Sequence, residues 1–302
     1  FCGSRVALLS AAFLCLSHFH FFWSRDGRYY PMLTLMGILF LWSFWGIVER
    51  QRLLMAPFAL LTGLALILTH YVGLLLLTAT ALTVPVFLLS RHWRSVFWFH
   101  RQAILLAAAA TVIVTVLTVP IWDQFVRKAF DMAGRNSTAA LPAFFDVTPH
   151  FLLHRIAETL QISVPCAYGV VTLMLFGFLW TLRHQPRLAL VWFSVSTVPF
   201  AVLWLFRPSH WWHPKYFIFM LPVLLILIVC GILWATTVSC RIIQYMYKRK
   251  TTVWAQHVGF LLACLGVGAL CVPNVSAILK DYAHPNQDMQ KLAALLTQSA
   301  RD

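Results

Sequence analysis

Residues 216–238 read YFIFMLPVLLILIVCGILWATTV, and this stretch decides the class of fold. None of its residues carries a full charge, and most are Leu, Ile, Val or Phe. About 20 mainly apolar residues are enough for a helix to cross the hydrocarbon core of a bilayer. The stretch is therefore predicted to be a membrane-spanning α-helix.

The whole chain has the composition of a membrane protein. Of its 302 residues, 61% are hydrophobic and 11% are charged, and the mean hydropathy is +0.78. Soluble globular chains are about 25% charged. This much apolar surface cannot be buried inside a soluble protein of 34.5 kDa. The same figures exclude a disordered chain, a collagen repeat and a small disulfide-stapled domain.

The apolar stretches predict an all-α fold, a polytopic transmembrane bundle of about nine spans. The third and fourth stretches are separated only by Thr69-His70-Tyr71, so they form either two spans or one re-entrant unit. The predicted spans are 6–23, 31–48, 53–69, 71–89, 104–121, 163–182, 188–206, 216–238 and 254–272.

The formal charge of +14 divides unevenly between the two sides of this bundle. The N-terminal side, with loops 49–52, 90–103, 183–187 and 239–253, holds twelve of the 23 Lys and Arg residues but one of the nine acids. Short basic loops mark the cytoplasmic side. We therefore expect the N-terminal end of this chain in the cytoplasm and the C-terminal end outside. The basic excess is then a topology signal and does not indicate nucleic acid as a partner.

The positions of the acidic residues indicate which class of function is less favoured. Eight of the nine fall on the extracytoplasmic side and none lies in the middle of a predicted span. Ion-coupled transporters usually keep an ionisable residue at midplane depth, so this pattern disfavours a pump. The two Asn-x-Ser/Thr sequons, at Asn136 and Asn274, also fall on the outer side.

Residues 1–272 are predicted to form the transmembrane domain, and residues 273–302 to begin a C-terminal extracytoplasmic segment.

The turn between the first two predicted spans is the first candidate site. Residues 24–31 read SRDGRYYP, which places Asp26 two residues from Arg28. The carboxylate suits a divalent cation or a sugar hydroxyl, and the guanidinium suits a phosphate. The alternative is a salt-bridged turn with tyrosines at the membrane interface.

Two further outer loops are candidates. Residues 207–217, RPSHWWHPKYF, suit a phosphorylated and partly apolar ligand, or else form an aromatic girdle with snorkelling cations. Loop 122–162 is too long for a simple connector and shows helical periodicity near 125–133 and over 150–161. These two segments are predicted to be amphipathic interfacial helices that either roof a cavity or anchor passively.

Four stretches follow recognisable motifs in chain order. Residues 16–30, LSHFHFFWSRDGRYY, fit an apolar span ending in lsPf and a turn S-x-E-x-R-x-Y, with His18 for proline and Asp26 for the acid. Residues 69–73, THYVG, are similar to tHyfG, and residues 215–222, KYFIFMLP, to RYflp.lP. Residues 282–294, YAHPNQDMQKLAA, are similar to qdWr.aa.yl. In these motifs the chain resembles the GT-C membrane glycosyltransferases, the group containing protein O-mannosyltransferases and bacterial lipid A aminoarabinose transferases.

The resemblance implies an enzyme of the bacterial inner (plasma) membrane. It would move a hexose or pentose from a polyprenyl-phosphate-linked donor to an acceptor lipid, glycan or protein on the extracytoplasmic face. The family's general base is an Asp in an earlier extracytoplasmic loop, which precedes the span matching 6–23. We therefore expect this chain to be a fragment that lacks the first catalytic loop and is inactive by itself.

The resemblance also assigns roles to residues of this chain. Asp26 would be a second acid, which orients the acceptor or holds a divalent cation if the enzyme uses one. Residues that bind the donor phosphate or line the substrate cavity would be Arg28, Tyr30, His70, Tyr71, Arg207, Lys215 and Tyr216. Among them, Arg28 and Lys215 would neutralise the leaving phosphate.

Two other classes of function stay open from the sequence. A transporter or flippase of a lipid-linked substrate would usually show an internal repeat, which is not evident, although Pro57, Pro85, Pro199 and Pro222 could interrupt helices. A non-catalytic scaffold subunit would also suit a chain without the first catalytic loop.

Overall fold

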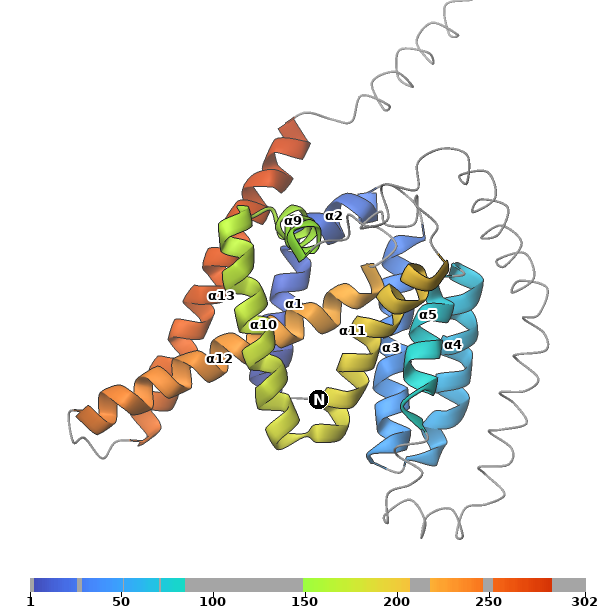
Figure 1. Ribbon diagram of the computed structural model, residues 1–302, viewed down its shortest axis with the longest axis horizontal. Coiled ribbons are helices and arrows are strands. Elements are labelled where there is room, and N and C mark those ends of the chain that lie inside the picture. The colour runs from blue at the N-terminus through green and yellow to red at the C-terminus, as the bar shows by residue number, and fades with distance from the viewer. Residues whose placement is uncertain are drawn as a thin grey trace, which may run out of the picture.

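A computed structural model describes residues 3–25, 29–50, 52–70, 72–84, 149–206, 218–246 and 252–283. Within these ranges the regular structure is entirely helical, as predicted, and contains no strand. Figure 1 shows the helices as a bundle that α12 crosses. The elements are α1 (Ser4–Cys15), α2 (His18–Arg25), α3 (Tyr30–Val48), η1 (Leu53–Met55), α4 (Ala56–Thr69), α5 (Gly73–Ala81), α9 (Pro149–Leu160), α10 (Val164–His184), α11 (Pro186–Phe206), α12 (Leu221–Met246) and α13 (Thr252–Ala283).

Four helical segments in the described ranges are long and apolar enough to cross a membrane. They are Tyr30–Val48, Val164–His184, Ile218–Tyr245 and His257–Asp281, and each overlaps a stretch predicted to be a span. The span predicted over 6–23 is formed by two helices, α1 and α2, which meet the same test only as a pair bent by 52°. The described part of the chain is thus a bundle of α-helices that contains four candidate membrane spans, or five with the bent pair.

Within the described residues, the structure does not identify the remaining predicted spans as membrane-spanning helices. Helices α4, α5 and α11 overlap the spans predicted at 53–69, 71–89 and 188–206, but none of the three is among the four candidates. The span predicted at 104–121 and the amphipathic helix near 125–133 lie outside the described residues. The total of nine therefore stays a prediction.

Local sequence explains where several helices begin and end. Proline occupies the first turn of α3, α4 and α10, where its missing N–H group costs nothing. Helix α9 ends in a Schellman motif: Gln161 has a φ of 53°, and the Ile162 N–H group donates to the Ala157 carbonyl at 2.9 Å. This motif turns the chain directly into α10.

Helix α12 is the central element of the bundle. In its apolar window 67% of the residues are buried, against 22% for α10 and 28% for α13. Two glycines let α10 pack closely on it. A Cβ atom on Gly177 would overlap the Leu227 carbonyl, and a Cβ atom on Gly231 would overlap the Leu173 carbonyl. The two backbones therefore touch, as at other helix crossings built on small residues in membranes.

Helices α3, α4 and α5 form a second tightly packed group. A Cβ atom on Gly37 of α3 would lie 3.3 Å from the Leu76 side chain of α5. A Cβ atom on Gly73, at the start of α5, would lie 2.7 Å from the Leu66 carbonyl oxygen of α4. Helix α11 joins this group through the Ser194 hydroxyl, which donates to the Ala79 carbonyl at 2.6 Å.

The bundle has two ends, named here from α3. At the Tyr30 end, Figure 1 shows α2, the start of α3, the end of α4, the start of α5, the end of α11 and the start of α12. At the Val48 end lie the end of α3, the start of α4 and the junction of α10 with α11. Helix α13 runs through residue 272 to Ala283, so the predicted boundary at 272/273 falls inside one helix. Residues 284–302 lie outside the described part.

Candidate functional site

Two of the predicted site residues, Tyr30 and His70, come together at the Tyr30 end. Both contact Tyr29, whose ring stacks on the His70 imidazole with centroids 4.3 Å apart and an interplanar angle of 21°. The Tyr29 and Tyr30 ring centroids lie 4.5 Å apart. Trp23 of α2 closes the group edge-on to Tyr30 at 5.2 Å. We call Trp23, Tyr29, Tyr30 and His70 the aromatic cluster.

The position of Tyr30 is fixed by the start of α3. Its side chain is 1% exposed, and its hydroxyl accepts a 3.3 Å hydrogen bond from the Tyr29 hydroxyl. Its carbonyl accepts a bond from the Thr34 hydroxyl one turn later, at 3.1 Å. Tyr30 is therefore a buried support of the cluster, whereas Tyr29 and His70 are half-buried and closer to the surface.

The position of His70 is fixed by the turn between α4 and α5. His70 ends α4 in an extended conformation, and its carbonyl accepts a 2.8 Å bond from the Gly73 N–H group. The Val72 N–H group donates to the His70 Nδ1 atom at 3.1 Å. Because Nδ1 accepts, the hydrogen of the neutral imidazole is on Nε2. The turn thus selects one tautomer of this histidine.

Six predicted site residues lie outside the described part of the chain: Asp26, Arg28, Tyr71, Arg207, Lys215 and Tyr216. The helix ends that flank them are described, and all of these ends are at the Tyr30 end of the bundle (Figure 1). The structure thus brings together Tyr30 and His70 and leaves the geometry of the other six untested. Sequence reasoning missed Tyr29 as a member of the cluster, although it lies in the quoted SRDGRYYP turn.

A polar junction at the start of α2, the helix that also carries Trp23, was not predicted. Asn274 of α13 is fully buried, and its Oδ1 atom accepts a 3.0 Å bond from the His18 N–H group at the start of α2. Its Nδ2 atom donates to the Leu160 carbonyl of α9 at 2.8 Å and to the Leu270 carbonyl at 2.9 Å. The His18 Nε2 atom also lies 2.9 Å from the Asp281 Oδ2 atom. This Asn274 junction ties α2, α9 and α13 together.

The junction changes the interpretation of the second sequon. A glycan needs an accessible amide nitrogen, and the Asn274 amide is buried and hydrogen-bonded in this fold. Asn274 is therefore a structural residue of the folded chain. Asn136 lies outside the described residues.

Helix α9 occupies the segment predicted to be a helix over 150–161. Leu153, Ala157 and Leu160 are buried, while His154 and Glu158 are exposed and lie 3.2 Å apart. Figure 1 shows α9 beside α2 at the Tyr30 end. The helix is present where it was predicted, and its place at a membrane interface stays a prediction.

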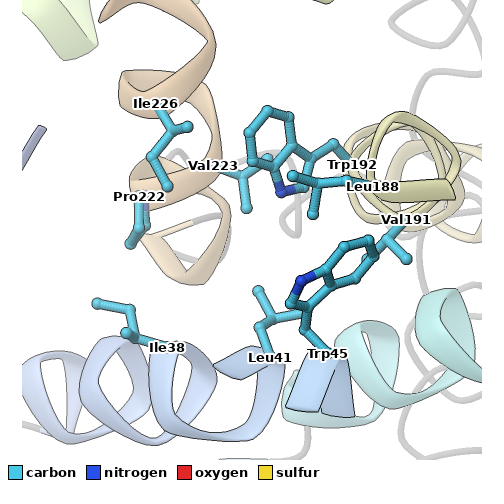
Figure 2. A pocket seen from close by; sticks show the side chains of 9 residues that line it. All are labelled: Ile38, Leu41, Trp45, Leu188, Val191, Trp192, Pro222, Val223 and Ile226. Carbon is cyan, nitrogen blue, oxygen red and sulfur yellow. The ribbon is translucent and has the colours of Figure 1, made fainter. Parts of the chain in front are cut away.

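A cavity between α3, α11 and α12 does not suit a substrate. Its volume is about 40 Å³, which is too small for a sugar or a prenyl chain. Figure 2 shows the indole rings of Trp45 and Trp192 and aliphatic side chains around it. Apolar cavities of this size stay dry. It is lined by Ile38, Leu41, Trp45, Leu188, Val191, Trp192, Pro222, Val223 and Ile226.

No metal site takes shape in the part of the chain that the structure describes. No group of three or more His, Cys, Asp or Glu side chains gathers there. The divalent cation considered at Asp26 concerns a residue outside this part.

The helices define the class of the protein: its described part is all-helical and contains several helices that are long and apolar enough to cross a membrane. The chain matches no protein-family model, no curated protein and no solved structure.

Proposed function

We propose that the chain is the membrane domain of a glycosyltransferase that uses a polyprenyl-phosphate-linked sugar and is similar to the GT-C group. The observation that carries the proposal is the stacking of Tyr29 on His70. This contact joins the SRDGRYYP turn to the THYVG turn, which belong to two of the four motifs on which the resemblance rests. Residues 41 positions apart in the sequence thus contribute to one end of the bundle, as a shared site requires.

The chemistry of the surrounding connections supports the proposal. Asp26 and Arg28 belong to the connection between α2 and α3, and Arg207 and Lys215 to the connection between α11 and α12. Both connections begin and end at the Tyr30 end of the bundle (Figure 1). The sequences of these two connections supply three cations and a carboxylate, which suit a sugar linked to a phosphate.

The proposed reaction is substitution at the anomeric carbon. An acceptor hydroxyl oxygen forms the new bond to that carbon and its proton passes to the general base, which the resemblance places in an earlier extracytoplasmic loop. The bond from the carbon to the donor phosphate breaks, and polyprenyl phosphate leaves. Charge develops on the phosphate as the bond breaks, so Arg28 and Lys215 would stabilise the transition state more than the ground state. Asp26 would orient the acceptor, and Tyr29, Tyr30 and His70 would support the turns.

The test measures transfer of radiolabelled sugar in membranes that contain the protein as its natural gene encodes it. Polyprenyl-phosphate donors carrying hexoses and pentoses are supplied to wild type, Arg28→Ala and Arg183→Ala. Arg183 is an exposed arginine at the opposite end of the bundle and serves as the matched control. Loss of a group that stabilises a transition-state charge typically lowers the rate about 100- to 1,000-fold. We expect that loss for Arg28→Ala and wild-type transfer for Arg183→Ala.

Two results would reject the proposal. Equal transfer by Arg28→Ala and wild type would remove this arginine from the mechanism. Movement of the labelled donor across the bilayer of reconstituted vesicles, without any covalent product, would identify a flippase instead.

A further inference from the structure

A second concave site lies at the Val48 end, away from the aromatic cluster. It is formed by the last turns of α3 and the chain that leads through η1 into α4. Its volume is about 40 Å³, and unlike the cavity of Figure 2 it has a strongly polar side. The lining residues are Trp42, Trp45, Gly46, Arg50, Arg52 and Met55.

The backbone gives this pocket a defined shape. The Arg52 N–H group donates to the Gly46 carbonyl at 3.0 Å, and the Met55 N–H group donates to the Arg52 carbonyl at 2.9 Å. A Cβ atom on Gly46 would lie 2.5 Å from the Met55 Sδ atom, so the thioether packs directly on the glycine. The chain after α3 is thus folded back against the helix that it leaves.

The charge of the pocket is positive and locally uncompensated. Arg50 and Arg52 are exposed, and within the described residues neither forms an ion pair. The nearest acid in sequence, Glu49, is engaged with Arg187 of α11 at 3.1 Å. The lining therefore carries two guanidinium groups and no carboxylate. Each guanidinium group can donate two parallel hydrogen bonds, so two of them suit the oxygens of a phosphate.

The apolar side of the pocket indicates a lipid and not a soluble anion. Trp45 is buried, whereas Trp42 is 45% exposed and meets Phe58 edge-on at 5.9 Å. Leu54, two residues after Arg52, is 95% exposed. The pocket lies where the candidate span Tyr30–Val48 ends. Tryptophan, exposed leucine and arginine together at the end of a span are typical of the headgroup region of a bilayer.

We propose that this pocket binds the headgroup of an anionic phospholipid. Arg50 and Arg52 hold the phosphate oxygens, while Trp42 and Leu54 contact the glycerol and the first part of the acyl chains. The proposal does not depend on the glycosyltransferase function, because the pocket and the aromatic cluster lie at opposite ends of α3.

The test uses the purified full chain in mixed micelles of phosphatidylglycerol and phosphatidylcholine. Native mass spectrometry counts retained phosphatidylglycerol as its fraction is raised, which gives an apparent affinity. Loss of a hydrogen bond between charged groups typically costs at least about a tenfold factor, so Arg50→Gln/Arg52→Gln should bind at least about 100-fold more weakly than wild type. The control pair Arg183→Gln/Arg241→Gln removes the same charge from exposed positions outside the pocket, so it loses only the diffuse attraction to the headgroups and should bind at least about tenfold more tightly than the pocket pair.

Other outcomes decide against the proposal. An equal loss in the control pair would show diffuse surface attraction, and competition by glycerol phosphate as strong as that by phosphatidylglycerol would show a site for soluble anions. If the glutamine pair does not fold, Arg50→Lys/Arg52→Lys replaces it. Lysine keeps the charge but lacks the planar fork, so we expect a severalfold loss of affinity. Unchanged binding by the lysine pair would overturn the proposed guanidinium contacts.

Discussion

Replacing Asn274 by alanine should destabilise the folded chain by about 2 kcal/mol. The substitution removes the acceptor of the His18 N–H group and the donor to the Leu160 carbonyl, both at the buried junction of α2, α9 and α13. Each group left without a partner costs about 1 kcal/mol, a value that holds for hydrogen bonds inside membrane proteins as well. The third bond, to the Leu270 carbonyl within α13, adds little because that oxygen already belongs to the helix ladder.

Equilibrium unfolding in mixed detergent micelles, followed by circular dichroism, measures this loss. The matched control is Ser276→Ala, which also destroys the sequon but changes an exposed side chain two residues away. A surface change of this kind should alter the free energy of unfolding by less than about 0.5 kcal/mol. The control therefore separates any effect of a glycan from the effect of the hydrogen bonds.

The reasoning would be refuted if Asn274→Ala and Ser276→Ala unfolded at the same detergent fraction. It would also be refuted by a glycan on Asn274 in the folded protein, because the amide could not then donate to both carbonyls. Amide hydrogen exchange gives a second readout. The His18 amide should exchange faster in Asn274→Ala, whereas amides in the middle of α3 should keep their protection.

Two further predictions concern the packing of α10 on α12 and an exposed ion pair. Gly177→Val should lower the free energy of unfolding by about 1–3 kcal/mol or more, because the valine side chain would overlap the backbone of α12. Gly268→Val, which has no neighbour within 4 Å, should have a much smaller effect on the thermal midpoint in detergent. In the ion pair between Glu49 and Arg187, both side chains are more than a third exposed to solvent. The pair should therefore contribute less than about 0.5 kcal/mol to stability, as measured in a double-mutant cycle. A coupling above about 1 kcal/mol would mean that this pair is shielded from water.

The candidate spans could be predicted from the sequence because long apolar runs leave few alternatives. Residues 31–48 and 163–182 become α3 and α10 almost unchanged, and prolines mark the start of both. Helices α12 and α13 extend to Met246 and Ala283, well beyond the predicted 238 and 272. Hydropathy reports where lipid contact ends, whereas a helix continues for as long as its backbone hydrogen bonds do.

The break between α1 and α2 could not be predicted from hydropathy. Neither proline nor glycine occurs there, and the apolar run continues across Leu16 and Ser17. Ser17 is a local signal, since its hydroxyl lies 3.5 Å from the His20 nitrogen in the manner of a helix N-cap. The partner of the His18 amide comes from Asn274, which no local pattern links to this position.

The candidate site was likewise predicted only in part from the sequence. Tyr30 and His70 were found through motifs that surround them, and the structure brings them to one cluster. Tyr29 was missed because its role depends on the register of α3 against the end of α4. That register is set by packing, for example of Gly63 of α4 against Phe40 of α3, and not by the turn itself.

The bond between His18 and Asn274 also has a consequence for how the protein is made. The two residues are 256 positions apart, so at about 5–20 residues per second the ribosome needs roughly 10–50 s to deliver the acceptor after the donor. During that interval the amide at the start of α2 lacks its native partner. The contact that holds the start of α2 against α13 can therefore form only after α13 has been synthesised, so a helix made late completes the packing of a segment made early.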